Sequence, residues 1–336
     1  MPGHWPIIGH EATVALLRHG LAAGRVAHAF LLTGPPAIGK FALASAFAQA
    51  LNCTGEAAPC GQCRACRLIG QNRHPDVRVI QMPDDKREIG IDQIRTVLHE
   101  ASLKPYEAAW KAYIVRDAET MSEEAANCLL KTLEEPPPQV ILMLTAPTPE
   151  ALLPTLVSRC QPIPMHPLPI SQIETALQAQ FGCDPQRAGL LARLSIGHMG
   201  WAIQAAGDQT ILEGRQRLLD RLAGFSRATR VDRLAFAAEQ GQRYGKDMSE
   251  RESVHAVLDL WSTWWRDLLL ANAGCQDMMV NADRAEALQR ETRRYSLAQV
   301  RAFLESLRAT GQQLRQNVNP RLALEVLVLA IPRGGQ

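Results

Sequence analysis

The sequence lacks a strong excess of charge of either sign. Its 336 residues include 36 Lys and Arg against 34 Asp and Glu, which gives a formal net charge of +2. Bulk electrostatics therefore neither favours nor excludes a nucleic-acid partner, and any contact with DNA would come from a local patch or from partner subunits. A hydrophobic fraction of 46% and a charged fraction of 21% are typical of a soluble globular protein.

Long apolar runs are also missing. The late run ALEVLVLAI, Ala323 to Ile331, is far too short to span a bilayer. The first residues do not combine a basic segment with an apolar run and a small-residue cleavage site, so no secretory signal is predicted. We expect a cytoplasmic protein with no membrane partner.

Cysteines are present but do not suggest a disulfide framework. Four of the eight crowd into CTGEAAPCGQCRAC, and the other four are scattered singly in apolar or helical contexts, where we expect reduced thiols. The crowded four are Cys53, Cys60, Cys63 and Cys66, and the scattered four are Cys128, Cys160, Cys183 and Cys275.

The crowded cysteines have the spacing of a metal site. Three form C-x-x-C-x-x-C, and six residues separate them from the fourth, so all four can fold back onto one tetrahedral Zn²⁺. An iron–sulfur cluster is the main alternative, although the continuing C-x3-C-P of a ferredoxin run is absent. Unligated surface thiols are the third possibility. Because the cluster lies in an insertion, we expect a structural zinc rather than a catalytic one.

A phosphate-binding loop is nearly complete at GPPAIGKF, residues 34–41. Gly34 and Gly39 free the backbone, and Lys40 is placed to reach phosphates. Phe41 stands where this motif requires Ser or Thr, so the hydroxyl that holds Mg²⁺ is missing. The loop predicts either weak nucleotide binding or only a tight turn between a strand and a helix.

The first half of the chain alternates strands and helices. Short apolar runs at 28–34, 77–82, 112–117 and 140–146 predict strands, and IDQIRTVLHEA (91–101), with Asp92 as its cap, predicts a helix. A second helix begins at Ser122 and is stopped by Pro136–Pro138. This alternation favours an α/β fold with a parallel sheet covered on both faces.

Prolines at 162–169, PIPMHPLP, mark the predicted end of the sheet domain, because this density of proline continues neither a sheet nor a helix. Beyond them the periodicity is helical to the end of the chain. We therefore predict a nucleotide-binding-like domain at 1–166 with its cysteine insertion at about 53–66. A small helical lid follows at 167–208, and a larger helical domain at 209–336.

An acidic residue is expected at the end of a buried strand to partner the phosphate loop. AYIVRDAE provides Asp117, which can hold Mg²⁺ or simply cap the following turn. The next residue, which in many ATPases is a Glu that polarises water, is Ala118 here. Glu119 follows one position later, where the side chain points elsewhere.

Several segments together resemble one family, the clamp-loader AAA+ subunits of bacterial DNA polymerase III. Their separation along nearly the whole chain makes the resemblance specific. They are HAFLLTGPPAIGK (28–40), the cysteine insertion followed by HPD (74–76), IGIDQIR (89–95), NCLLKTLEEPP (127–137), LVSRC (156–160) and NVNPRLALE (317–325).

The resemblance implies a five-stranded AAA+ sheet, a three-helix lid and a helical collar that joins a pentameric ring with gamma/tau and delta subunits. Such a ring loads the sliding clamp onto primer–template DNA. In this family the SRC arginine, here Arg159, reaches the nucleotide of the neighbouring subunit, where a guanidinium supplied in trans stabilises charge on the γ-phosphate. A loop salt bridge is the alternative role of Arg159.

Three parts of an ATPase are missing while the part that serves a neighbour is kept. Phe41 removes the Mg²⁺ hydroxyl, Ala118 the carboxylate, and Gly200 stands where the family's motor subunits carry a lid arginine. We therefore expect an accessory subunit with no independent catalysis. The alternative is an ATPase motor resembling gamma/tau, which is favoured by the intact Gly34, Gly39, Lys40 and Asp117. A standalone zinc-dependent nucleic-acid binder is a weaker third hypothesis.

Two other features are expected to be structural. The aromatic run WSTWW, Trp261 to Trp265, has the helical spacing of core or collar packing rather than of a base-stacking platform. His28 and His74 lack the spacing of metal ligands.

Overall fold

The computed structural model describes residues 5–83, 86, 88–225, 228–246, 248–316 and 318–332. These form two compact units. The first runs to Ala176 and includes Gly197–Trp201, and the second comprises Leu177–Ile196 and the chain from Ala202 onward.

The first unit is built on a five-stranded sheet in which all neighbouring strands are parallel, in the order β2-β3-β4-β1-β5. Every residue of β1, β3 and β4 is buried, as expected for central strands covered on both faces. The strands are β1 (Ala29–Thr33), β2 (Val77–Ile80), β3 (Lys111–Val115), β4 (Val140–Ala146) and β5 (Gln161–Pro164).

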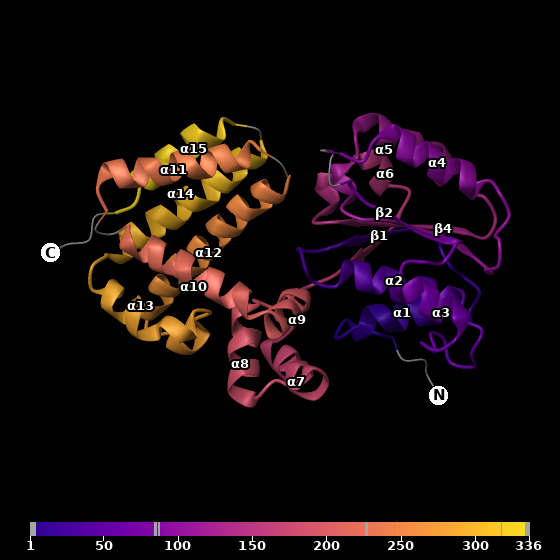
Figure 1. The fold of residues 1–336 in the computed structure, drawn as a ribbon, viewed down its shortest axis with the longest axis horizontal. Coiled ribbons are helices and arrows are strands. Elements are labelled where there is room, and N and C mark those ends of the chain that lie inside the picture. Colours follow the sequence, from indigo (N-terminus) through magenta and orange to yellow (C-terminus); the bar gives the residue numbers. More distant parts are fainter. Residues whose placement is uncertain are drawn as a thin grey trace. The chain divides into compact units, whose positions relative to one another are not determined.

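Helices cover both faces of the sheet (Figure 1). Phe30 and Leu32 point to one face and pack with helix α2, whereas Leu31 points to the other. This alternation follows from the two-residue period of a strand. The first face carries α1 (Glu11–Ala22), α2 (Lys40–Leu51) and α3 (Arg64–Gly70), and the second carries α4 (Ile91–Ala101), α5 (Glu123–Glu134) and α6 (Pro154–Val157).

The predicted α/β class and the expected start of α5 are confirmed. The Ser122 side chain accepts a hydrogen bond from Ala125 N–H at the first turn of α5, and the helix ends at Glu134, before the three prolines. Three-residue 3-10 turns follow β3 and β4, η1 (Ala118–Thr120) and η2 (Pro149–Ala151).

Two expectations are wrong. The proline-rich segment does not lie outside the sheet, because its first residues form the edge strand β5, where Pro162 and Pro164 pair in register with Leu31 and Thr33 of β1. An edge strand tolerates proline because only one of its sides must donate hydrogen bonds. Helix α4 is also not capped by Asp92. It starts after Gly90, whose N–H donates to the Gln93 side chain.

Three helices follow the sheet: α7 (Ile170–Phe181), α8 (Pro185–Leu194) and α9 (Met199–Gly207). The division into compact units cuts through this region, so a separate lid at 167–208 and the other predicted domain boundaries stay predictions.

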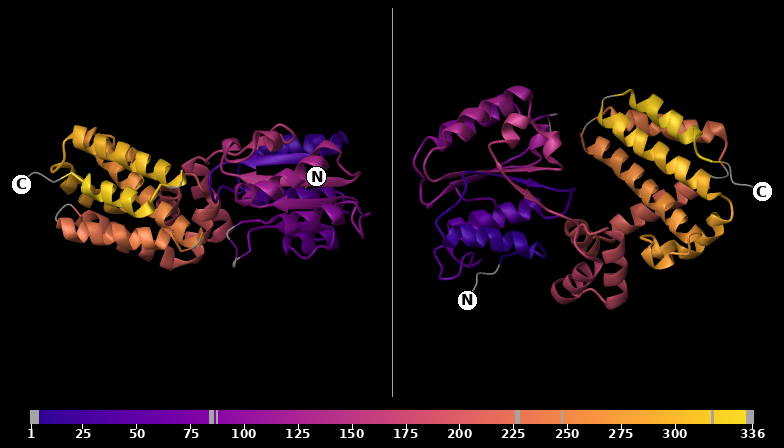
Figure 2. Two further views of the ribbon diagram at one scale, coloured as in Figure 1. Left: turned by 90° about the horizontal axis from the view of Figure 1, so that it is seen from above. Right: turned by 180° about the vertical axis from the view of Figure 1, so that it is seen from behind.

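The second unit is helical and contains a bundle of long helices, seen from behind in Figure 2. Helix α11 packs on α15, and α12 packs on α14. Trp261, Trp264 and Trp265 are 1–4% exposed within its core, which confirms the packing role expected of the aromatic run. The helices are α10 (Gln209–Gly224), α11 (Arg230–Tyr244), α12 (Met248–Asn272), α13 (Ala285–Thr292), α14 (Leu297–Arg315) and α15 (Pro320–Leu329).

Within the described ranges, every helix is either too short or too polar to cross a lipid bilayer. Asn317, the first residue of the segment NVNPRLALE, lies outside the described residues. Asn319 of the same segment caps α15 by accepting a hydrogen bond from Leu322 N–H.

Candidate functional site

The phosphate loop joins the carboxyl end of β1 to the start of α2. Its glycines are required by the backbone, since Gly34 and Gly39 have φ angles of +151° and +109°. A Cβ atom on Gly34 would lie 2.5 Å from the carbonyl oxygen of Met165. The glycines therefore serve the turn itself, whether or not a phosphate is bound.

Lys40 is turned onto the carbonyl oxygens of its own loop. Its Nζ donates to Gly34 O at 2.5 Å and to Pro35 O at 3.0 Å, and the residue is 8% exposed. Burial lowers the pKa of the Lys40 ammonium, while the carboxylates of Asp117 and Glu119 act in the opposite direction. The group that would contact phosphate is therefore already partnered within the chain.

Phe41 occupies the first turn of α2 and packs partly against the apolar core of that sheet face. The guanidinium of Arg116 lies 4.9 Å from the centre of its ring, and Arg116 Nη1 donates to Gln81 Oε1 at 3.1 Å. A cation stacked on an aromatic ring thus replaces the hydroxyl that the motif would offer to Mg²⁺.

Asp117 follows β3 as expected and adopts a left-handed conformation with φ of +50°. Its N–H donates to the side chain of Thr145 at 2.9 Å, but its carboxylate forms no capping bond to η1. Ala118, next to it, is buried with 1% exposure. Thr145 was missed by the sequence analysis, although it is a polar residue near the end of the apolar run VILMLTA.

Gly200, the position at which we predict the loss of a lid arginine, touches the phosphate loop directly. Its N–H donates to Ala37 O at 2.8 Å, and a Cβ at this position would lie 2.7 Å from the same oxygen. Any larger residue would have to push the loop and the start of α9 apart. The glycine permits this contact.

Arg159 lies in the loop between α6 and β5 and is engaged on its own chain. Its Nη2 contacts Glu134 Oε1 at 2.5 Å, and its Nη1 donates to Thr155 O at 2.9 Å and contacts Ser158 Oγ at 3.4 Å. The side chain of Arg159 remains 33% exposed and that of Glu134 53%. The predicted alternative, a loop salt bridge, is therefore present.

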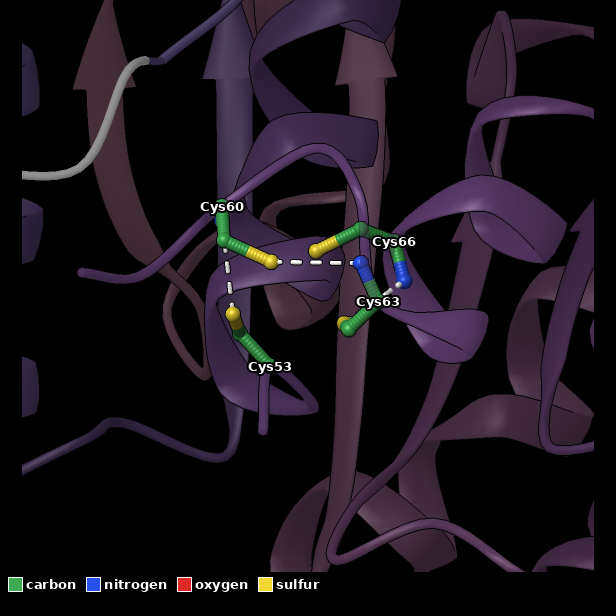
Figure 3. Close-up of side chains that lie close together, drawn as sticks. All are labelled: Cys53, Cys60, Cys63 and Cys66. Carbon is green, nitrogen blue, oxygen red and sulfur yellow. Dashed lines mark hydrogen bonds between the residues drawn. The ribbon is translucent and has the colours of Figure 1, made fainter. Parts of the chain in front are cut away.

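The four clustered cysteines converge on one point (Figure 3). Their sulfur atoms all lie within 4.8 Å of one another. Tetrahedral Zn–S bonds of about 2.3 Å place sulfurs roughly 3.8 Å apart, so a small inward movement would complete the geometry. The donor set fits a metal ion that prefers thiolates.

Backbone N–H groups also point at the sulfur atoms. Cys60 N–H donates to the Cys53 sulfur, Cys63 N–H to that of Cys60 and Cys66 N–H to that of Cys63, at 3.3–3.4 Å. The bond from Cys63 lowers the pKa of the Cys60 thiol because it favours the thiolate. Burial acts the other way on two of the thiols and raises the pKa of Cys53 and that of Cys66, the latter to about 12. Because metal binds the thiolate, an ion would have to displace these protons.

Buried side chains fasten the cluster, and the loop at residues 106–108, to the sheet domain. Gln49 of α2 donates to Cys66 O at 2.9 Å. Asp76 accepts hydrogen bonds from Tyr106, Glu107 and Ala108 N–H at 2.7–2.9 Å. His74 accepts from Asp76 N–H, which is consistent with its predicted structural role. All eight cysteines have free thiols, as predicted for the scattered four.

Comparison with known proteins decides the family. Residues 9–169 match the family model described as DNA polymerase III, delta subunit, and residues 246–332 match the model of its C-terminal part. The chain belongs to this DNA polymerase III delta-subunit family. Residues 9–169 contain the phosphate loop, the cysteine cluster and Arg159, and residues 246–332 lie in the helical unit.

Individual relatives agree with this family. The chain is 29% identical to the DNA polymerase III subunit delta' of Bacillus subtilis over 95% of each chain. It is 41% identical to the delta' subunit of Pseudomonas aeruginosa over 40% of this chain and 42% of that one. It is 34% identical to the DNA polymerase III subunit tau of Escherichia coli over 62% of this chain but only 33% of the relative.

Within this family framework, the structure brings together some predicted residues and not others. The four cysteines converge, and Lys40 and Asp117 lie near enough for their charges to interact. The sequence did not predict three contacts of these residues: Glu134 with Arg159, Thr145 with Asp117, and Arg116 with Phe41. For Glu134 the one available signal was an acidic residue just before the prolines.

Proposed function

We propose that the chain is a clamp-loader subunit with the role of delta-prime: it places Arg159 on the ATP of a neighbouring subunit and does not hydrolyse ATP itself. The observation that carries the proposal is the engagement of the phosphate loop with its own chain. Lys40 binds two carbonyl oxygens of the loop, and Gly200 binds a third.

A loop in this condition is poorly suited to hydrolysis. Carbonyl oxygens of the loop take two of the three N–H donors of Lys40, which leaves at most one for a triphosphate, and Phe41 offers no oxygen to Mg²⁺. No carboxylate stands at Ala118 to polarise water. Because Lys40 is engaged and a Mg²⁺ ligand is missing, we expect ATP and Mg²⁺ to bind weakly or not at all.

Arg159 has the properties needed to act on a neighbour. A third of its side chain is exposed, and its planar guanidinium can donate two parallel hydrogen bonds to phosphate oxygens. Fingers of this kind contribute about 10³–10⁵ in rate when they stabilise charge on a γ-phosphate. The neighbour that supplies the nucleotide would be a gamma/tau subunit.

Assembly into a pentameric ring with gamma/tau and delta is supported by an apolar stripe on α15. Leu322, Val326 and Leu329 are 57%, 68% and 50% exposed and recur at helical spacing. Exposed stripes of this kind mark contacts with other proteins. Through the ring the subunit would act on the sliding clamp and primer–template DNA, in the cytoplasm.

We further propose that the cysteine cluster holds a structural Zn²⁺. Cys53, Cys60, Cys63 and Cys66 would be its four ligands, leaving no open position for substrate. The ion would fix the loop between α2 and α3.

A second candidate function is that of an ATPase motor like gamma/tau. It is favoured by the retained Gly34, Gly39, Lys40 and Asp117 and by the similarity to the tau subunit. In this case the purified chain would hydrolyse ATP with Mg²⁺, and Lys40→Ala would abolish the turnover.

The test measures ATP hydrolysis twice. The purified chain is assayed with Mg²⁺, with and without primed DNA and clamp, and we expect no turnover. The loader is then reconstituted with gamma/tau and delta, with either wild-type chain or Arg159→Ala. We expect the variant to lower ATP turnover by about 10³-fold at the site that Arg159 serves. Equal turnover with both chains would rule out the trans role.

A further inference from the structure

We propose that Glu134 is a positioning residue that sets the Arg159 guanidinium for the nucleotide of the neighbouring subunit. The inference rests on the proposed function. It starts from the 2.5 Å contact between Glu134 Oε1 and Arg159 Nη2, which joins two residues 25 positions apart in the sequence.

Glu134 stands on a fixed backbone. It is the last residue of α5, and the preceding Leu133 is buried with 2% exposure. The carbonyl oxygen of Leu133 lies 3.0 Å from His28 Nε2, which donates in the tautomer that this contact requires. Because β1 begins at Ala29, this bond ties the end of α5 to the central sheet.

The backbone of Arg159 is fixed as well. Its N–H donates to Leu156 O at 3.1 Å, and Cys160 N–H donates to Val157 O at 3.2 Å. Cys160 is 8% exposed, and β5 begins at the next residue. With both backbones fixed, only the side-chain torsions of Glu134 and Arg159 remain free to vary.

Three contacts select one orientation of the guanidinium. Thr155 O and Ser158 Oγ lie at Nη1, and Glu134 lies at Nη2. Arginine has many rotamers, and groups that pre-order a functional side chain raise the fraction of encounters in which it is correctly placed. In the described part of the chain, Nε has no hydrogen-bond partner, so donors remain for a phosphate oxygen.

The contact is suited to positioning rather than to stabilisation. Ion pairs between exposed side chains contribute little to folding, and Glu134 is more than half exposed. Such a pair is too weak to withhold Arg159 from a triphosphate, whose charge exceeds that of one carboxylate. Losing the pair should therefore slow the reaction while leaving the fold intact.

The experiment measures ATP hydrolysis by the reconstituted loader as a function of ATP concentration. The chain carries Glu134→Ala, Glu134→Gln or the control Glu135→Ala, which changes the exposed neighbouring carboxylate. We expect Glu134→Ala to lower kcat about 10-fold with KM unchanged, the scale of losing an outer-shell partner. Glu134→Gln keeps an oxygen acceptor and should recover most of the rate, and the control should match wild type.

A second pair of loaders carries Arg159→Ala with and without Glu134→Ala. We expect no further loss in the double variant, because a residue that acts through Arg159 has nothing left to position. A further 10-fold loss on this background would overturn the proposal, since it would mean an independent role.

The outcomes separate the two proposals. If Arg159→Ala leaves turnover unchanged, the proposed function fails. If Arg159→Ala slows turnover but Glu134→Ala equals wild type, changes only KM or speeds turnover, the positioning inference alone is overturned. Thermal unfolding of each purified variant verifies that the chain is folded, and the Gln variant provides a second measurement if the Ala variant is not.

Discussion

The cysteine cluster and the phosphate loop both have motifs that are nearly complete in sequence, but their functional groups are arranged in opposite ways. In the cluster, four sulfur atoms converge within 4.8 Å, and backbone N–H groups donate to the sulfurs of Cys53 and Cys60. In the loop, the Lys40 ammonium is bound by carbonyl oxygens of the same loop.

This is the difference expected between a ligand site and a structural turn. A thiolate that accepts one N–H bond still has electron pairs for a metal ion, so its partners prepare it for binding. Two of the three donors of the Lys40 ammonium are taken by its own loop, and turning them to phosphate costs free energy, because each lost hydrogen bond of a buried charge is unfavourable. A motif therefore predicts function only when its polar groups remain available.

The largest effect is expected from removing a metal ligand. Cys63→Ser should abolish zinc binding and lower the free energy of unfolding by about 5 kcal/mol or more, because structural zinc contributes about 10–16 kcal/mol in small domains. Metal analysis and urea denaturation measure both quantities. Cys275→Ser, at an exposed thiol outside the cluster, is the matched control.

If Cys63→Ser keeps its full metal content and wild-type stability, the cluster is not a metal site. The cluster and the phosphate loop would then no longer differ in their capacity to bind a ligand. Iron and visible absorption in the purified wild-type chain would instead support the iron–sulfur alternative.

A smaller effect is expected at Gly34. Gly34→Ala should lower the free energy of unfolding by about 2–4 kcal/mol, because alanine is strained at a φ of +151° and its Cβ would meet Met165 O at 2.5 Å. Urea denaturation without nucleotide measures the effect. Gly214→Ala in α10, where a Cβ meets nothing within 4 Å, should be neutral or stabilising.

A Gly34→Ala chain as stable as wild type would contradict the structural role of the loop. The glycine would then be explained only by a phosphate.

The smallest effect is expected at Lys40. Lys40→Met should lower the free energy of unfolding by about 1–3 kcal/mol without nucleotide, because Gly34 O and Pro35 O lose their donor. Lys104→Met, at an exposed position, is the control. If Lys40→Met leaves stability unchanged but abolishes measurable ATP binding, the loop is a nucleotide site and the comparison fails.

The role of Lys40 can also be tested through the pH dependence of the free energy of unfolding. The pKa of Lys40 is lowered in the folded chain relative to the value of 10.5 that applies when it is unfolded. Between the two pKa values the unfolded chain binds more protons, so the free energy of unfolding should rise as pH increases through this interval. Lys40→Met should lose this rise.

Much of the first unit follows from local sequence patterns. The apolar runs of β1, β3 and β4 predict buried strands because each must be covered on both faces. Ser122 and the prolines after Glu135 bound α5 because capping and the missing proline N–H act within one helical turn. The local rules failed at β5, where partnership with β1 at the sheet edge overrides the proline content.

The sequence by itself determined the α/β fold, the cysteine cluster and the missing catalytic groups at Phe41 and Ala118, because residue type and spacing along the chain suffice for these. Only the tertiary structure decided that Lys40 binds its own loop, that Gly200 touches Ala37 and that Glu134 pairs with Arg159. The contacts of Gly200 and Glu134 join residues far apart along the chain. That of Lys40 depends on the turn that closes the loop, and spacing alone specifies none of the three.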